Sequence, residues 1–385
     1  MARREAPAAG PGSRALIVDV IRSANTISRV ELADLTGLTQ PSISIIVREL
    51  ITDGIIHETG STDSVRGKPR KLISLNPNNR FGVGIHLGPE TVTCVAIDLT
   101  GGVVGREVVP FTGAGAAALA GRFDDFTQAL DLPRERIEGL AVVGPAGNTG
   151  LGGALRAELT SSIGLPVIVE NDAAAAALGE FWSRRVSREQ SFGCIYVGAG
   201  IGAGFVFGGA LFRGASFDAG ELGHMSIAFD GRECPCGNRG CVERYASTTA
   251  VVAEARATPL GRRLGLEGAT TAGAYDLISR AAVNGDRDAH AIVDQAAAYL
   301  SVAVTSMVNL LDLGRLVLTG PGVALAGAIH ARRLRGHLDR TAHARRRHGI
   351  VVELSAQPRD TAAIGAAALV VQASIAPGHT PGQAY

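Results

Sequence analysis

A cluster of metal-ligand side chains between positions 224 and 241 constrains the fold of this chain more than any other feature. It consists of His224, Cys234, Cys236 and Cys241, and it holds three of the five cysteines of the chain. Imidazole and thiolate are ligands that zinc prefers in proteins, and four of them complete a tetrahedral structural site. The alternative is a loop with incidental cysteines, but free thiols are usually small buried apolar groups. The pattern therefore predicts a structural Zn²⁺ site that holds this loop and the flanking Glu221 and Glu243 in place.

The length and the charge of the chain limit the classes of protein to consider. Its 385 residues suffice for two or three domains, and a net charge of +1 gives no global electrostatic reason to bind nucleic acid or a membrane. No uninterrupted apolar run is long enough to span a bilayer, and the N-terminus lacks the apolar segment of a secretory signal. We therefore expect a cytoplasmic protein with no membrane partner. In a reducing cytoplasm, clustered cysteines indicate metal binding rather than disulfides.

Residues 13–76 carry the signals of three short helices followed by a hairpin. Ser13 is expected to cap the first helix, and the capping-box pattern from Ser28 to Glu31 opens the second. The second helix ends at a glycine, which supplies a left-handed backbone position, and Thr39 caps the third helix. Helix, tight glycine turn and helix is the order of a helix-turn-helix.

The third helix and the hairpin provide candidate DNA contacts. The apolar residues of this helix form one stripe, which leaves small polar side chains and an arginine on its other faces. Two expected strands, 54–58 and 71–75, flank a basic tip of the kind that lies along a phosphate backbone. Together they predict a winged helix-turn-helix that binds double-stranded DNA; the alternative is a three-helix protein-interaction module with a solvated basic loop. The candidate DNA-binding residues are Gln40, Ser42, Ser44 and Arg48 in the helix, and Arg66, Lys68 and Arg70 in the wing.

The remainder of the chain, residues 81–375, has an α/β pattern. Three apolar runs joined by tight turns predict three consecutive strands at its start, and later strands alternate with helical segments. This pattern predicts mixed sheets. Residues 77–80 are expected to link this domain to the N-terminal one, and residues 1–12 and 376–385 are expected to be disordered tails.

Two groups of motifs resemble known proteins. The runs 38–44 and 66–70 resemble the winged helix-turn-helix of bacterial sugar-responsive repressors. The zinc loop and the run 169–173 resemble the ROK family, which comprises repressors, open reading frames and kinases. This second resemblance covers residues 80–375. It implies the two-lobed fold of the actin/hexokinase-like ATPases.

The resemblance to the ROK family also implies a sugar-binding site. Asp172 matches an aspartate that acts in the kinases of the family as general base for the attacking hydroxyl. The alternative for Asp172 is helix capping, and for Glu221 it is a surface carboxylate. One departure is Ala174, which stands where family members usually have asparagine. The effector-binding residues that the resemblance implies are Asn171, Asp172, Glu221, His224 and Glu243, with Asn148 as a further candidate.

The nucleotide side of the resemblance carries several departures. In the kinases of the family, a strand turn with an aspartate and Gly-Gly-Thr holds the nucleotide phosphates. Here His86 replaces the aspartate, and Pro89 replaces a glycine and removes a backbone donor. Glu90 adds negative charge at a site meant for phosphate, and Pro321 stands where a second turn commonly has glycine. We therefore expect no ATP binding and no enzymatic activity.

These observations predict a transcription regulator, a repressor, whose affinity for operator DNA changes when a sugar or sugar derivative closes the cleft between the lobes. Symmetric half-sites favour a homodimer or a dimer of dimers. One alternative is an active ATP-dependent sugar kinase with a DNA-binding domain, in which Asp172 is catalytic. The other is a ligand-independent regulator that is controlled by a protein partner.

Overall fold

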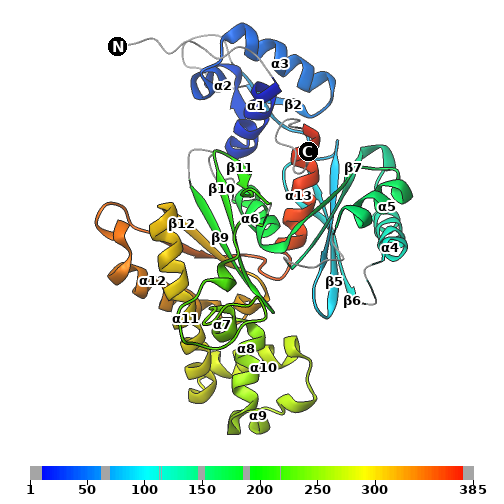
Figure 1. The fold of residues 1–385 in the computed structure, drawn as a ribbon. Helices are drawn as coiled ribbons and strands as arrows, with labels where there is room; N and C mark the ends of the chain where they lie inside the picture. The colour runs from blue at the N-terminus through cyan, green and yellow to red at the C-terminus, as the bar shows by residue number, and fades with distance from the viewer. Residues whose placement is uncertain are drawn as a thin grey trace.

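The computed structural model describes residues 11–61, 70–111, 113, 115–145, 152–184, 191–216 and 218–375. Within these residues, a small N-terminal unit stands on a larger two-lobed body (Figure 1). Three candidate site residues, Arg66, Lys68 and Asn148, lie outside the described residues. The expected tail 376–385 and the first ten residues of the other tail also lie outside them.

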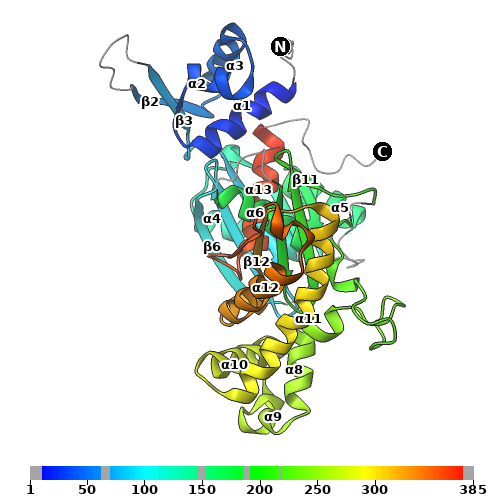
Figure 2. The same ribbon diagram turned by 90° about the vertical axis from the view of Figure 1, so that its left-hand side faces the viewer.

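The N-terminal unit contains, within its described residues, three helices and a three-stranded sheet. Their bounds are α1 (Pro11–Ala24), β1 (Ile27–Ser28), α2 (Arg29–Thr36), α3 (Gln40–Thr52), β2 (Ile56–Ser61) and β3 (Lys71–Leu75). The strands are antiparallel in the order β1-β3-β2, and β2 and β3 extend from the side of the unit (Figure 2). Ile17, Leu32 and Ile43, one from each helix, are completely buried. This is the winged helix-turn-helix arrangement that the sequence predicts.

Local capping signals place the helix ends of this unit. Ser28 and Glu31 form the predicted capping box, in which each side chain accepts the backbone N–H of the other residue. Thr39 Oγ1 accepts a backbone N–H in the first turn of α3, as predicted. The predicted Ser13 cap is wrong, because α1 already begins at Pro11. Proline is favoured in the first helical turn, where its fixed φ fits and its missing N–H is not needed.

Two five-stranded mixed sheets form the lobes of the body. The first has the order β6-β5-β4-β7-β8 and the second has the order β11-β10-β9-β12-β13. In each, three consecutive antiparallel strands are followed by two strands parallel to the first, so the two topologies are the same. The bounds are β4 (Phe81–Leu87), β5 (Thr91–Asp98), β6 (Val103–Pro110), β7 (Ile137–Gly144), β8 (Val167–Asn171), β9 (Phe192–Val197), β10 (Ile201–Phe207), β11 (Ala210–Phe212), β12 (Arg315–Thr319) and β13 (Val351–Leu354).

Two helices, α6 (Asp172–Ser183) and α13 (Thr361–Ile375), join the two sheets. α6 packs on β9 and β10, α13 packs on β4, β5 and β7, and the two helices pack against each other. A Cβ at Gly204 in β10 would lie 2.5 Å from the carbonyl oxygen of Ala173 in α6, so the close contact requires glycine. The sequence does not predict β10, because glycine is more typical of turns than of strand interiors.

Further helices cover the outer faces of the lobes. The first lobe has α4 (Ala116–Ala129), η1 (Arg134–Arg136) and α5 (Gly153–Ile163). The second has η2 (Leu222–His224), α7 (Glu243–Ala246), α8 (Thr248–Arg256), α9 (Pro259–Arg263), η3 (Leu266–Gly268), α10 (Thr271–Val283), α11 (Arg287–Leu311), η4 (Pro321–Val323), α12 (Gly327–Thr341) and η5 (His343–Arg346). Helices α8, α9 and α10 form the end of the body opposite the N-terminal unit (Figures 1 and 2).

Among the described residues, helix α11 is the one that has to be considered as a possible membrane span. By length and composition alone this helix is long and apolar enough, and half of its apolar window is buried inside the protein. It packs against α10 and α12, with Val293, Leu300 and Val304 buried. Packing in the core of the second lobe therefore accounts for its apolar composition.

Candidate functional site

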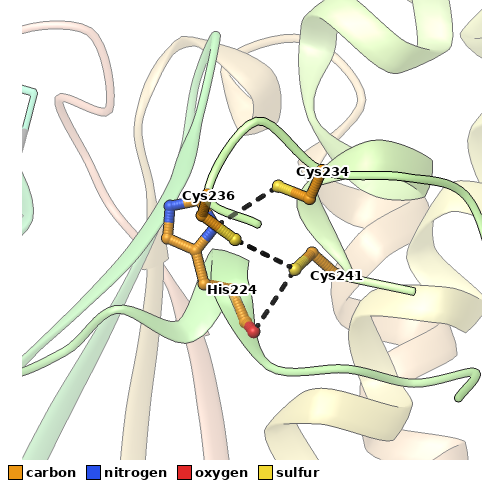
Figure 3. A group of neighbouring side chains, drawn as sticks. All are labelled: His224, Cys234, Cys236 and Cys241. Atoms are coloured by element: carbon orange, nitrogen blue, oxygen red, sulfur yellow. Dashed lines mark hydrogen bonds between the residues drawn. The ribbon is translucent and has the colours of Figure 1, made fainter. Parts of the chain in front are cut away.

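The four predicted zinc ligands converge at one point (Figure 3). Their ligand atoms all lie within 4.8 Å of one another. His224 is the last residue of η2, and the cysteines follow on a loop that two isolated bridges close, Ser226 with Cys241 and Glu233 with Arg239. The loop therefore folds back on itself and brings distant sequence positions to a single centre.

The spacing of the ligand atoms fits a tetrahedral zinc ion. His224 Nδ1 lies 3.6 Å from Cys234 Sγ, and Cys236 Sγ lies 3.7 Å from Cys241 Sγ. Zn–S bonds of about 2.3 Å at tetrahedral angles separate two sulfurs by about 3.8 Å. Burial raises the pKa of Cys241 to about 12, so a metal ion that binds here has to displace the proton of this thiol. Donor types and spacing both fit structural Zn²⁺.

The second ring nitrogen of His224 connects this cluster to the candidate sugar site. Its Nε2 lies 3.7 Å from Glu221 Oε2. A carboxylate in this position fixes the ring orientation of a metal-bound histidine. Burial raises the pKa of Glu221 and His224 opposes this, while the carboxylates of Glu243 and Asp172 are near enough to raise the pKa further. Asp172 and Glu243 therefore lie within electrostatic range of Glu221.

Gly220 fixes the backbone immediately before Glu221. Its φ is 108°, and a Cβ at this position would lie 1.8 Å from the carbonyl oxygen of Ala203 in β10. In addition, its own carbonyl accepts the N–H groups of Ala203 and Leu222 at 2.7 Å and 2.6 Å. Only glycine allows this approach, so the loop is held against β10 at the point where Glu221 begins it.

Asn171 and Asp172 lie where β8 ends and α6 begins. Asn171 Oδ1 accepts the backbone N–H of Ala174 at 2.8 Å, so the N-cap is Asn171 and not Asp172. The side chain of Asp172 is 13% exposed, and its Oδ2 lies 3.7 Å from His86 Nε2. Burial and the nearby Asp172 raise the pKa of Tyr196, so its hydroxyl stays protonated beside this pair.

A buried ion pair next to these residues is not predicted by the sequence. Arg213, which follows β11 in the second lobe, donates Nε to Glu170 Oε2 at 2.8 Å. The side chains are only 14% and 6% exposed, and Glu170 Oε1 also accepts the backbone N–H of Asn171. Glu170 thereby connects the two lobes at the candidate sugar site. No local signal reveals the pair, because its members are far apart in sequence.

Glu243 is held by the turn between β9 and β10. Its Oε2 accepts the backbone N–H of Ile201 at 3.0 Å, and its other oxygen makes no hydrogen bond within the described residues. The carboxylate therefore has a structural contact as well as a place near Glu221.

The turns that the resemblance associates with nucleotide phosphates make direct contacts with the rest of the body. Glu90, at the turn between β4 and β5, accepts the backbone N–H of Ala272 in the first turn of α10 at 3.1 Å. A helix amino end attracts negative charge, and here a carboxylate of the first lobe occupies it. On the second lobe, the Tyr275 hydroxyl donates to the carbonyl of Gly322 beside Pro321 at 2.7 Å.

The candidate DNA-binding residues of α3 lie on its outer surface. Gln40 and Arg48 are exposed, Ser42 and Ser44 are partly exposed, and Arg70 in the wing is exposed. Ile45, which the sequence analysis did not select, lies on the same side of α3 and is 55% exposed. An apolar residue exposed between polar ones on such a helix is suited to contact a thymine methyl group.

The fold and site define a class: a winged helix-turn-helix joined to a two-lobed, actin/hexokinase-like domain with a Cys₃His cluster. A family model described as the ROK family matches residues 140–373. This chain therefore belongs to the ROK family, and the predicted family and fold are confirmed.

Three comparisons illustrate its relatives. The xylose repressor of Caldicellulosiruptor bescii is 25% identical over 381 residues, which cover 93% of this chain and 95% of that protein. A glucokinase of Halalkalibacterium halodurans is 33% identical over 226 residues, 57% of this chain and 67% of the other. The crystal structure of a ROK family transcriptional regulator, a homologue of the E. coli Mlc protein, has a TM-score of 0.74 and 26% identity, with 95% of this chain and 96% of the other covered.

Proposed function

We propose that this protein is a DNA-binding transcriptional repressor whose ROK domain senses a sugar or sugar derivative and thereby alters operator affinity. One observation carries the proposal. A single chain combines an exposed helix-turn-helix surface with the carboxylates Asp172, Glu221 and Glu243 of the proposed sugar site. Its Glu90, at the turn expected to hold nucleotide phosphate in a kinase, instead accepts a hydrogen bond from Ala272. The near full-length similarity to a xylose repressor supports the same conclusion, whereas the glucokinase similarity covers only part of the chain.

Residues 13–76 form the proposed DNA-binding unit, joined to the ROK domain, 81–375, by residues 77–80. In it, α3 enters the major groove and the wing follows a phosphate strand. The side chains of α3 read base edges. Arg70 of the wing contacts phosphates, and the same role is proposed for Arg66 and Lys68, which lie outside the described residues. We add Ile45 to the base-reading set because it is exposed among them.

The proposed effector site contains Asn171, Asp172, Glu221, His224 and Glu243, with Asn148 outside the described residues as a further candidate. Carboxylates bind vicinal hydroxyls well, because each accepts at two closely spaced oxygens. The proximity of Asp172 and Glu243 to Glu221 supports a single polyhydroxylated ligand among them. Zinc is proposed as a structural cofactor that holds His224 and the adjacent loop.

Loss of kinase activity is part of the proposal. Mg²⁺ prefers oxygen ligands, and position 86 carries a histidine in place of the family aspartate. The carboxylate of Glu90, bound at the amino end of α10, adds negative charge where nucleotide phosphates would approach. We therefore propose no ATP cofactor and no enzymatic activity. The proposed assembly is a cytoplasmic homodimer or dimer of dimers, which matches paired half-sites in operator DNA.

The test is binding of the purified protein to a fluorescent fragment of its own upstream DNA, with a panel of pentoses, hexoses, amino sugars and their phosphates. We expect specific binding that one sugar releases and that rising salt weakens strongly. Arg48→Ala serves as the control for specific contact. An ADP-release assay with the same panel accompanies it, and sustained turnover would overturn the non-enzymatic part. DNA binding that is indifferent to every sugar would favour a protein-partner regulator instead.

A further inference from the structure

Helix α6 has its two ends in two different parts of the molecule. Its amino end carries Asn171 and Asp172 of the proposed effector site. Its carboxyl end carries Phe181 and Trp182, which share a hydrophobic core with Ile21 of α1. With 12 residues the helix spans about 18 Å. One rigid element therefore connects the effector site to the DNA-binding unit.

Arg22 of α1 attaches the DNA-binding unit to this carboxyl end. The residue is only 3% exposed, and its guanidinium donates to the backbone carbonyl of Trp182 at 3.2 Å. The same guanidinium lies 5.0 Å from the ring centroid of Phe181 and 5.4 Å from that of Trp182. Asp19, one turn earlier on α1, holds it in this orientation at 2.8 Å. A cation in this position binds a carbonyl of the last helical turn and interacts favourably with the negative end of the helix dipole.

Helix α6 is packed too tightly to absorb a displacement along its length. Every residue from Ala173 to Trp182 is buried, and the helix packs on both β10 and α13. Close-packed elements move as units rather than deforming continuously. The carboxyl end of α13 lies directly beneath α1 as well (Figures 1 and 2).

The contact also contains a buried donor that has no partner. Among the described residues, the indole Nε1 of Trp182 is buried and makes no hydrogen bond. Leaving a buried donor unpaired is unfavourable, so this arrangement does not satisfy every group at the contact. An arrangement of α1 on α6 in which Nε1 has an acceptor would remove this cost. An effector that binds such an arrangement better would increase its population.

We propose that Arg22 is the positioning residue of the regulator: it fixes α1 to the carboxyl end of α6, so that α6 passes a displacement at Asn171 on to the DNA-binding unit. The sugar ligand, its site at Asn171 and the DNA-binding role of the N-terminal unit rest on the function proposed above. The attachment and the transmission stand on the contacts of Arg22 and on the packing of α6.

The experiment uses the full chain and needs neither sugar nor DNA. Trp182 is the only tryptophan of the chain, so its fluorescence reports directly on the attachment. Emission maximum and acrylamide quenching are measured together with hydrogen–deuterium exchange of α1 peptides. The first variant is Arg22→Gln, and Arg14→Gln is its matched control, because Arg14 lies on the same helix but pairs with Asp53 of the DNA-binding unit. Arg22→Lys keeps the charge, and it replaces Arg22→Gln if the latter does not fold.

The second step perturbs the other end of α6. Asn171→Ala removes the N-cap, and Asn171→Ser, which keeps a capping oxygen, is its control. We expect Arg22→Gln to shift the Trp182 emission to longer wavelength and to speed α1 exchange severalfold, with Arg14→Gln unchanged. Asn171→Ala alone should change the Trp182 fluorescence and the exchange of α1. Combined with Arg22→Gln, it should cause no further change in either quantity beyond that of Arg22→Gln alone.

Two results would overturn the proposal. If Arg22→Gln, or Arg22→Lys in its place, leaves Trp182 and α1 unchanged, Arg22 does not attach the unit. If Asn171→Ala alters hydrogen–deuterium exchange only in the first turn of α6, the helix does not pass a displacement at Asn171 on to α1. Because no sugar is added, either result is distinct from a failure of sugar sensing, which the DNA-release panel detects by itself.

Discussion

At the scale of single residues, Asp172 allows a test of charge in the proposed effector site, because its side chain is only 13% exposed. Replacing it with asparagine keeps the shape and removes charge-assisted hydrogen bonds to sugar hydroxyls. Asp172→Asn is expected to weaken binding of the releasing sugar by about 10- to 100-fold, while operator affinity without sugar stays unchanged. Calorimetry measures the first quantity and DNA titration the second. Asp124→Asn, an exposed substitution on α4, is the control; equal sugar affinity in both variants would exclude Asp172 from the site.

Cys236 offers a clean test of the zinc site because its side chain is exposed. Cys236→Ser therefore loses little packing, and any large effect reports the loss of a metal ligand. We expect the variant to lose zinc and to unfold at a lower temperature than the wild type, since metal binding contributes to folding. Elemental analysis and thermal melting measure both. Full stoichiometric zinc in Cys236→Ser would contradict the tetrahedral assignment.

Several residues of the site follow from the sequence and others do not. The Cys₃His spacing predicts a centre by itself, because chelation by a short loop is local. Asn171 takes the capping role that the sequence left open for its neighbour, and the distinction depends on where β8 ends. Arg213 and Glu170 are 43 positions apart and meet only because the two lobes close on one another.

At the scale of elements, α3 is expected to read the operator. Arg48 is exposed on its outer surface, so Arg48→Ala should weaken operator binding by about 1–3 kcal/mol if it contacts a guanine. If it contacts a phosphate instead, the slope of log affinity against log salt should fall by about 1, for all sequences alike. Anisotropy titrations at several salt concentrations distinguish these. Arg14→Ala on α1 is the control, and identical behaviour of both variants would remove Arg48 from the interface.

Helix α12 makes the stability of the second lobe depend on pH. Burial lowers the pKa of His330, although its bond to the Ala326 carbonyl and the nearby Asp294 oppose this. The folded pKa therefore lies below the unfolded value of about 6.5, and the unfolded chain binds the proton more readily. The contribution of His330 to the free energy of unfolding is therefore fully present above pH 6.5. It decreases as the pH drops below this value, by at most about 1.4 kcal/mol per pH unit.

Urea unfolding at pH 7.5 and 5.5 measures this effect. In His330→Gln, the free energy of unfolding should differ less between pH 7.5 and pH 5.5 than it does in the wild type, because the contribution of His330 is absent. A difference equal to that of the wild type would show that other groups carry the dependence.

The elements predicted best are those with local end signals. The capping box of α2 and the Thr39 cap of α3 are encoded within a few residues, so the sequence suffices. The start of α1 was misplaced because Pro11 is compatible with a helix start and Ser13 has a stronger capping preference. The glycines of strand β10 are explained by the close packing of α6 against it. This is a tertiary contact, which the local sequence does not reveal.

At the scale of the whole molecule, the Arg213–Glu170 ion pair holds the lobes together. Arg213→Gln leaves a buried carboxylate without its partner, which typically costs about 3–5 kcal/mol. Arg122→Gln, whose partner Glu107 lies in the same lobe and has a side chain that is 41% exposed, should cost less than about 1 kcal/mol. Urea unfolding compares the two. Equal losses would mean that the pair contributes no more than a surface contact.

The shared strand order of the two sheets gives the body an internal pseudo-twofold symmetry. In this symmetry α6 and α13 are counterparts, since each follows the fifth strand of its own half. The proposed DNA-binding unit sits over the carboxyl ends of both helices (Figure 1). A rotation of one half against the other would therefore reach the proposed DNA-binding unit through α6, to which Arg22 attaches it, and through α13.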